Sequence, residues 1–158
     1  MSDLHQKSDH SLLQLVTFRV ASEEFGIDIL SVQEIIRTME ITKVPRAPMI
    51  VEGVINLRGK VIPIVGLRKK FGLEVKPYDS KTRIIVVDLR GTVVGFVVDE
   101  VSEVLRIPSS TVEPPPAIVS GIDSEYIDGV GKIEDRLLIL LDLDRLLTRD
   151  EQQGLSGF

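Results

Sequence analysis

The chain repeats part of its own sequence, and this repeat limits the folds open to it more than any other feature. Three segments of the first half return in the second half, at offsets of about 76 or about 69 residues, with glycine, charged and apolar positions in the same order. The pairs are Glu52-Gly53-Val54 with Asp128-Gly129-Val130, Val61–Val65 with Leu137–Leu141, and Val32–Arg37 with Val101–Arg106. Segments rich in Val, Ile and Leu also align by chance, but the shared order favours a duplication. It predicts two units of roughly 60 to 65 residues, each marginally stable alone, that share apolar surface.

Short apolar runs separated by Gly, Pro, Asp and charged residues are typical of strands. The candidate strands are Leu13–Val20, Phe25–Leu30, Val54–Leu57, Lys60–Val65, Ile84–Leu89, Thr92–Val98, Glu103–Ile107 and Leu137–Leu141. Two short helices are expected directly after strands, over Leu67–Phe71 and Asp142–Leu147. Four or five strands in each unit close most naturally as a small barrel, because closure hides the strand edges. The sequence therefore predicts a mostly β fold of two small β-barrels packed together, with short helices.

The repeat also predicts how the chain is divided. We expect a disordered N-terminal tail over residues 1–11, a first β-barrel subdomain over 12–80, a second over 81–150 and a C-terminal tail over 151–158. The offset between the repeated segments changes from about 69 to about 76 residues within the loop around Pro108–Glu125, which contains a stiff run of prolines. A strand exchanged between the two barrels would leave all of these patterns unchanged, so the strand pairing stays open.

Composition argues against several classes of function. The net charge is −5 and only 4% of the residues are aromatic, which disfavours nucleic acid as a partner. The chain has no cysteine, and both histidines, His5 and His10, lie in the expected N-terminal tail. Disulfides, a metal site, histidine-based catalysis and a bound cofactor are therefore not expected. The apolar runs are too short to span a membrane and no signal peptide pattern opens the chain, so we expect a cytoplasmic protein without direct membrane insertion.

Three motifs resemble nucleotide or catalytic sites without matching them. Gly53–Val61 has five residues between its glycines and no hydroxyl residue after its lysine, so it is interpreted as a hairpin with the turn Arg58-Gly59. Gly129-Val130-Gly131 lacks the third glycine of a dinucleotide motif and is interpreted as a turn. Asp142 and Asp144 are better placed to cap a short helix than to form an acid–base pair. We expect no enzymatic activity.

Glu34 and Arg58 are charged residues within or beside strongly apolar stretches of the same unit. The guanidinium fork of an arginine suits a carboxylate, and a turn position would let Arg58 reach a neighbouring strand. An exposed ion pair adds little stability, so its expected role is to orient a docking surface. Two unrelated surface charges are the alternative. Glu103 is equivalent to Glu34 in the second unit, which is typical of a shared structural role.

Several segments resemble the CheW family of chemotaxis coupling proteins. They span about residues 12 to 150 and are Phe25–Arg37, Ile41–Pro48, Val51–Ile64, Val94–Val101 and Leu138–Asp142. The most specific string is Glu52–Gly59, which is also found in the matching regulatory domain of the histidine kinase CheA. The other domains of that kinase do not fit into 158 residues, so a free-standing adaptor is expected.

The resemblance implies two SH3-like five-stranded β-barrels and an adaptor function. Such an adaptor couples the cytoplasmic tips of methyl-accepting chemoreceptors to the regulatory domain of CheA in membrane-associated signalling arrays. One barrel surface would bind the kinase, and a groove near the seam between the barrels would receive the receptor tip. The partner-binding residues implied by the resemblance are Glu34, Arg58, Gly53, Asn56, Leu57, Val32, Ile35, Val101 and Val104. We expect about half of the last four to be core residues, and the isolated protein to be a monomer.

A ligand-binding small β-barrel from an unrelated pathway is the alternative function. Such a module would need a basic or aromatic binding face. The aromatic residues are instead scattered along the chain, at Phe18, Phe25, Phe71, Tyr78, Phe96, Tyr126 and Phe158. The adaptor is therefore the favoured interpretation.

Overall fold

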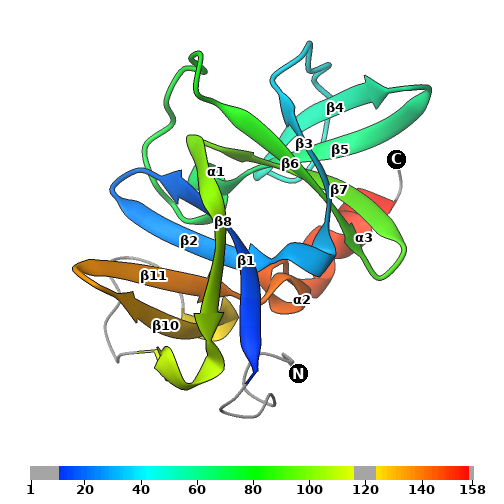
Figure 1. Cartoon of the computed structure of the whole chain (residues 1–158). Coiled ribbons are helices and arrows are strands. Elements are labelled where there is room, and N and C mark those ends of the chain that lie inside the picture. The colour runs from blue at the N-terminus through cyan, green and yellow to red at the C-terminus, as the bar shows by residue number, and fades with distance from the viewer. Residues whose placement is uncertain (1–10, 116–123, 157–158) are drawn as a thin grey trace.

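The computed structural model describes residues 11–115 and 124–156 and arranges their strands in two sheets (Figure 1). The six-stranded sheet has, in spatial order, β8 Glu100–Pro108, β1 Leu12–Val20, β2 Glu23–Asp28, β11 Arg136–Leu141, β10 Ile127–Ile133 and β9 Val112–Glu113. The five-stranded sheet has β3 Val32–Arg37, β6 Arg83–Leu89, β7 Thr92–Val98, β5 Lys60–Gly66 and β4 Val51–Leu57. The helices are α1 Leu67–Lys70, α2 Leu143–Leu146 and α3 Arg149–Ser156, with 3-10 turns at Ile29–Ser31, Ser109–Thr111 and Ser124–Tyr126. The predicted mostly β fold with short helices is confirmed.

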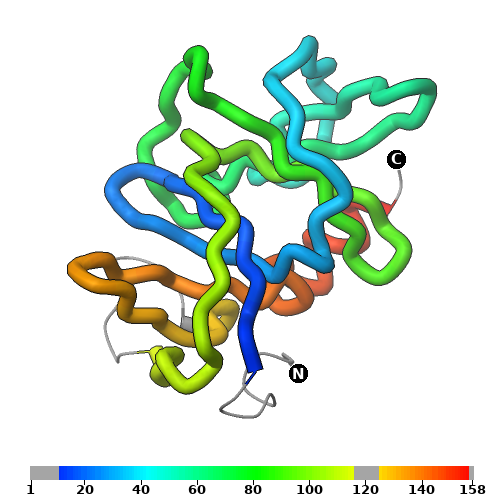
Figure 2. The backbone as a smooth tube through the Cα atoms, viewed as in Figure 1, coloured from blue at the N-terminus to red at the C-terminus, as the bar shows by residue number. Residues whose placement is uncertain are grey.

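Apart from the two-residue strand β9, the two sheets have the same strand arrangement, as the repeat predicts. The hairpin β1–β2 is equivalent to β6–β7, β3 to β8, and β4–β5 to β10–β11. Each sheet takes strands from both halves of the chain, because β3 pairs with β6 and β8 pairs with β1. Figure 2 shows β8, in yellow-green, running beside β1, in blue. The sheets therefore do not follow the division between residues 80 and 81, and the two β-barrel subdomains with those bounds stay a prediction.

Strands β6 and β11 are apolar on both faces because each face lies in a different core. In β11, Ile139 and Leu141 belong to the core shared by the two sheets, whereas Leu138 and Leu140 belong to a small core of the six-stranded sheet. Strand β6 is divided in the same way between the shared core and a small core of the five-stranded sheet. Successive side chains of a strand point to opposite faces, so burial on both faces requires an unbroken apolar run.

Gly26 and Gly95, which are equivalent in the repeat, leave room for these small cores. A Cβ on Gly95 would lie 2.6 Å from Cδ1 of Ile64 and 2.7 Å from Cγ2 of Ile84. A Cβ on Gly26 would lie 3.2 Å from Cδ2 of Leu140. Both glycines lie where the second strand of a hairpin pairs in parallel with a strand of another hairpin, β2 with β11 and β7 with β5. Close packing therefore explains why glycine recurs at this position.

Three observed strands were not among the predicted ones, namely β3, β9 and β10. The register shifts between Val32 and Glu34 in β3, and between Ile127 and Gly129 in β10. Such a bulge interrupts the alternation of side chains on which strand prediction depends. The interpretation of Gly129-Val130-Gly131 as a turn is therefore wrong, because these residues lie within β10. Residues 1–10 of the expected N-terminal tail and 116–123 of the proline-containing loop lie outside the described residues.

The expected C-terminal tail is wrong for residues 151–156, which belong to helix α3. The backbone N–H of Thr148 donates to Oε1 of Glu151 over 2.8 Å, and the N–H of Glu151 donates to Oγ1 of Thr148 over 3.1 Å. This is a capping box, and its Thr-x-x-Glu spacing is the sequence signal that predicts the helix. Glu151 also accepts a 2.8 Å hydrogen bond from Nζ of Lys70 on α1, and Leu155 is buried in the shared core.

Replacing Glu151 by glutamine is expected to lower the free energy of unfolding by about 1 kcal/mol at neutral pH. Burial favours the neutral form, but the hydrogen bonds from Lys70 and Thr148 hold the pKa of Glu151 below its usual value. A carboxyl whose pKa is lower in the folded protein adds stability above its ordinary pKa and loses it as the pH falls. Urea unfolding should therefore separate wild type from Glu151→Gln at neutral pH, and hardly at all near pH 3. Asp150→Asn, an exposed neighbour, is the control, and an equal loss in both variants would contradict this account.

Candidate functional site

Glu34 and Arg58 contact each other and join the two edges of the five-stranded sheet. Glu34 lies on the edge strand β3, and Arg58 lies in the turn that follows the other edge strand, β4. Nη1 of Arg58 donates to Oε1 of Glu34 over 3.3 Å, and Nη2 donates to Oε2. The hydrogen bond and the charge of Glu34 raise the pKa of Arg58. The predicted contact is confirmed, and the arginine side chain remains 69% exposed.

The backbone of the β4–β5 turn determines the direction of Arg58. Arg58 and Gly59 both have positive φ angles, 51° and 87°, as a two-residue type I′ hairpin turn requires. Oδ1 of Asn56 accepts a 2.8 Å hydrogen bond from the N–H of Gly59 and so closes the turn. Asn56 therefore helps to set the direction of the Arg58 side chain indirectly, by stabilising the turn.

A groove of about 230 Å³ lies beside this ion pair. We call it the Glu34 groove, and its lining residues are Gln33, Glu34, Leu57, Arg58, Lys60, Ile62, Val86 and Val93. Its apolar side chains are buried or half-buried, whereas Gln33, Arg58 and Lys60 are exposed. Apolar surface rimmed by polar and charged groups is the usual composition of a protein–protein contact.

Gly53 is buried and has a structural role rather than a place in the groove. Its φ angle is +147°, and a Cβ there would overlap the carbonyl oxygen of Thr42 and lie 2.8 Å from Cγ2 of Ile41. This close approach accompanies two backbone hydrogen bonds between Thr42 and Val54, of 2.9 and 2.8 Å. Gly53 thus lets the segment after β3 pair with β4.

The four aliphatic candidates divide evenly between core and surface, as expected. Val32 and Val101 pack against the shared core, whereas Ile35 is 39% and Val104 is 55% exposed. Ile35 directly follows Glu34 on a strand, so its side chain points to the opposite side of β3. Of the predicted binding residues, Leu57 and Asn56 therefore lie beside the ion pair. None of these four aliphatic residues lines the groove.

A second ion cluster lies on the six-stranded sheet and was missed by the sequence analysis. Nε and Nη2 of Arg136 donate to Glu24 over 3.1 and 2.6 Å, and Nη1 donates to Oε2 of Glu103 over 3.1 Å. We call these three residues the Arg136 cluster. The repeat finds Glu103 as the counterpart of Glu34, but Arg136 is equivalent to Lys60 and not to Arg58. Figure 1 shows the hairpins β4–β5 and β10–β11 extending to opposite sides of the molecule.

Comparison with known proteins identifies the family. The model of the CheW-like domain matches residues 14–151. The chain belongs to the CheW-like family. The chemotaxis protein CheW of Klebsiella aerogenes is 40% identical over 138 residues, which are 87% of this chain and 83% of that protein. That of Treponema pallidum is 35% identical over 148 residues, 91% of this chain and 87% of that protein. The crystal structure of the scaffolding protein TtCheW from Thermoanaerobacter tengcongensis is similar with a TM-score of 0.82 and 37% identity, covering 89% of this chain and 96% of that one.

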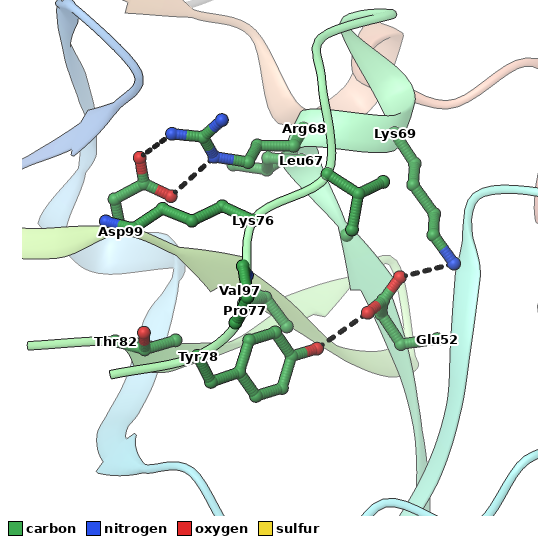
Figure 3. A pocket seen from close by; sticks show the side chains of 12 residues that line it. Glu52, Leu67, Arg68, Lys69, Lys76, Pro77, Tyr78, Thr82, Val97 and Asp99 are labelled. Carbon is green, nitrogen blue, oxygen red and sulfur yellow. Dashed lines mark hydrogen bonds and ion pairs between the residues drawn. The ribbon is translucent and has the colours of Figure 1, made fainter. Parts of the chain in front are cut away.

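The CheW-like domain also has a small cavity of about 30 Å³ beside α1, shown in Figure 3. Four of its charged side chains are paired with one another: the guanidinium of Arg68 with Asp99, and Nζ of Lys69 with Oε2 of Glu52 over 2.7 Å. The hydroxyl of Tyr78 donates to Oε1 of Glu52 over 2.7 Å, and burial raises its pKa, so it stays protonated at neutral pH. The cavity has room for no more than a few water molecules. The ion pairs around it connect α1 to β4 and to the junction of β7 and β8, and the cavity is not a ligand pocket.

The aromatic rings of the CheW-like domain are largely core residues. Phe18, Phe25, Phe71 and Tyr126 stack in a row in the shared core, with ring centroids 5.1 to 5.8 Å apart. These four rings cannot form a binding face. Over residues 11–115 and 124–156, no group of His, Asp or Glu side chains is placed to hold a metal ion, and no helix is long and apolar enough to cross a membrane.

Proposed function

We propose that this CheW-like protein is a non-enzymatic adaptor that couples the cytoplasmic tips of chemoreceptors to the regulatory domain of the kinase CheA. Membership of the CheW-like family over residues 14–151 carries the proposal. Relatives named as chemotaxis proteins and a structural relative named as a scaffolding protein support it. The protein would act in the cytoplasm, at membrane-associated receptor arrays, and would be a monomer when isolated.

We assign the Glu34 groove to the kinase. The groove offers apolar walls, including Leu57, beside the exposed fork of Arg58. An apolar side chain of the kinase would enter the groove, while the ion pair fixes the rim and the direction of approach. Asn56 and Gly53 act indirectly, because one closes the turn that presents Arg58 and the other permits the pairing beside β4.

The receptor tip would bind at the seam between the two sheets, as the family resemblance implies. Ile35 and Val104 are proposed as exposed apolar contacts, one on each sheet, while Val32 and Val101 support them from the shared core. Several modest interfaces of this kind gain strength when one body links them.

Binding assays on the full chain test this function. The kinase regulatory domain and a receptor cytoplasmic fragment are each titrated onto the immobilised protein. Both are expected to bind, with dissociation constants of roughly micromolar order, as is common for signalling contacts of modest size. Failure to retain either partner would overturn the adaptor function, and turnover of a small compound by the purified chain would favour an enzyme instead.

A further inference from the structure

Asp99, at the junction of β7 and β8, connects three parts of the fold. Its Oδ1 and Oδ2 accept hydrogen bonds from Nε and Nη2 of Arg68 over 3.0 and 2.6 Å, and Oδ2 also accepts one from the N–H of Ala21 over 2.8 Å. The N–H of Asp99 donates to the carbonyl of Arg19 over 3.0 Å. Figure 3 shows the two-point contact between Arg68 and Asp99. Arg68 belongs to α1, which follows the five-stranded sheet, and Ala21 to the β1–β2 turn of the six-stranded sheet.

The equivalent place on the other side of the molecule is held much less firmly. Arg90, in the β6–β7 turn, is the repeat counterpart of Ala21, and Asp144, on α2, is the counterpart of Arg68. One contact of 3.6 Å joins them, from Nε of Arg90 to Oδ1 of Asp144. Their side chains are 76% and 44% exposed, against 21% and 18% for Arg68 and Asp99. Sheltered two-point contacts are stronger than exposed single ones, so one of these two equivalent places is a tight joint between the sheets and the other is a loose joint.

Besides these contacts and the ion pair of Lys70 on α1 with Glu151 on α3, the sheets are joined by the large shared core, which is apolar. Apolar burial is favourable in many orientations, whereas a forked hydrogen bond between an arginine and a carboxylate fixes direction. The Glu34 groove lies on the five-stranded sheet and the Arg136 cluster on the six-stranded sheet. Their relative orientation therefore depends on how the two sheets are joined.

We propose that Asp99 is a positioning residue that fixes the orientation of the five-stranded sheet, with its Glu34 groove, relative to the six-stranded sheet. The proposed adaptor function gives this orientation its importance, since two partners must be held at a defined angle. Burial disfavours its charged form, but the hydrogen bonds from Arg68 and Ala21 lower the pKa of Asp99. The carboxylate is therefore ionised at neutral pH and accepts the hydrogen bonds from Arg68 and Ala21.

Distance measurements between the sheets test the inference without any partner. The chain has no cysteine, so Gln33→Cys and Ser102→Cys introduce two unique sites for spin labels. Both residues are exposed, they are equivalent in the repeat, and they lie on β3 and β8, one in each sheet. Pulsed electron paramagnetic resonance then gives the distribution of distances between the labels.

In this background Asp99→Ala is expected to shift the distribution or broaden it about twofold, as the sheets gain relative motion. Asp144→Ala, the matched change at the loose joint, should leave it unchanged. Urea unfolding shows whether each variant is folded, and if Asp99→Ala is not, Arg68→Gln removes the fork while leaving Asp99 bonded to Ala21. An unchanged distribution in the folded variant overturns the inference.

Binding measurements separate this inference from the proposed function. Asp99→Ala should leave the affinity for each single partner within about twofold of wild type, but should lower retention of the kinase on receptor-bearing vesicles about tenfold. A variant that was merely less stable would lose its affinity for the kinase, its affinity for the receptor fragment and the retention of kinase on vesicles together. If wild type binds neither partner, the adaptor function fails, while the distance distributions still decide the role of Asp99.

Discussion

Arg58→Glu is expected to weaken binding of the kinase regulatory domain about 100-fold. The substitution removes the guanidinium fork and puts a second carboxylate beside Glu34, so the rim of the Glu34 groove becomes repulsive. The fold should be unaffected, because Arg58 lies in an exposed turn and an exposed ion pair contributes little to stability. Calorimetric titration of the kinase domain into each variant measures the loss.

Arg90→Glu is the matched control for this prediction. Arg90 begins another two-residue Arg-Gly hairpin turn, with φ of 53° against 51° for Arg58, and it does not line the Glu34 groove. It gives the same change of net charge in the same backbone conformation. Equal losses in the two variants would mean that net charge, and not the groove, governs binding. Wild-type affinity in Arg58→Glu would remove the groove from the interface.

Gly53→Ala is expected to cost about 3 to 5 kcal/mol of the free energy of unfolding. Its φ of +147° is rare for a residue with a side chain, and the added methyl would overlap the backbone carbonyl of Thr42. The carbonyl cannot move aside without breaking its hydrogen bond to Val54. Most domains of this size have a total stability of only about 5–15 kcal/mol, so this variant should be close to unfolding.

Gly59→Ala separates the two causes of that loss. Gly59 also has a positive φ, +87°, but a Cβ there would meet nothing within 4 Å. Its replacement should cost about 1 kcal/mol, from backbone strain alone. The chain has no tryptophan, so urea unfolding is best followed by far-ultraviolet circular dichroism. Similar losses at both glycines would contradict the close contact with Thr42.

The short apolar runs and the repeat were sufficient to predict the class of fold, because strands that are buried on both faces leave unbroken apolar runs in the sequence. The repeat did not determine which strands pair with each other. The equivalence of Val32–Arg37 with Val101–Arg106 is equally compatible with β3 in either sheet, so the pairing with β6 appears only in three dimensions. The bulges in β3 and β10 further hid these strands, since they break the alternation of side chains.

The candidate site was predicted unevenly for similar reasons. The contact of Glu34 with Arg58 was found because both charges interrupt apolar stretches. The Arg136 cluster was missed, since its arginine reaches Glu24 across the parallel pairing of β11 with β2, more than 100 residues away in the sequence. Gly53 was placed among the binding residues, yet its strict geometry is a requirement of the backbone.

One measurement tests the adaptor directly. Vesicles that carry receptor cytoplasmic fragments are mixed with the kinase, with and without this protein, and sedimented. The kinase should sediment with the vesicles only when the protein is present, and the sedimented amounts of kinase and adaptor should rise together. Sedimentation of the kinase that does not depend on the protein, or sedimentation of the protein while the added kinase stays in solution, would contradict the account.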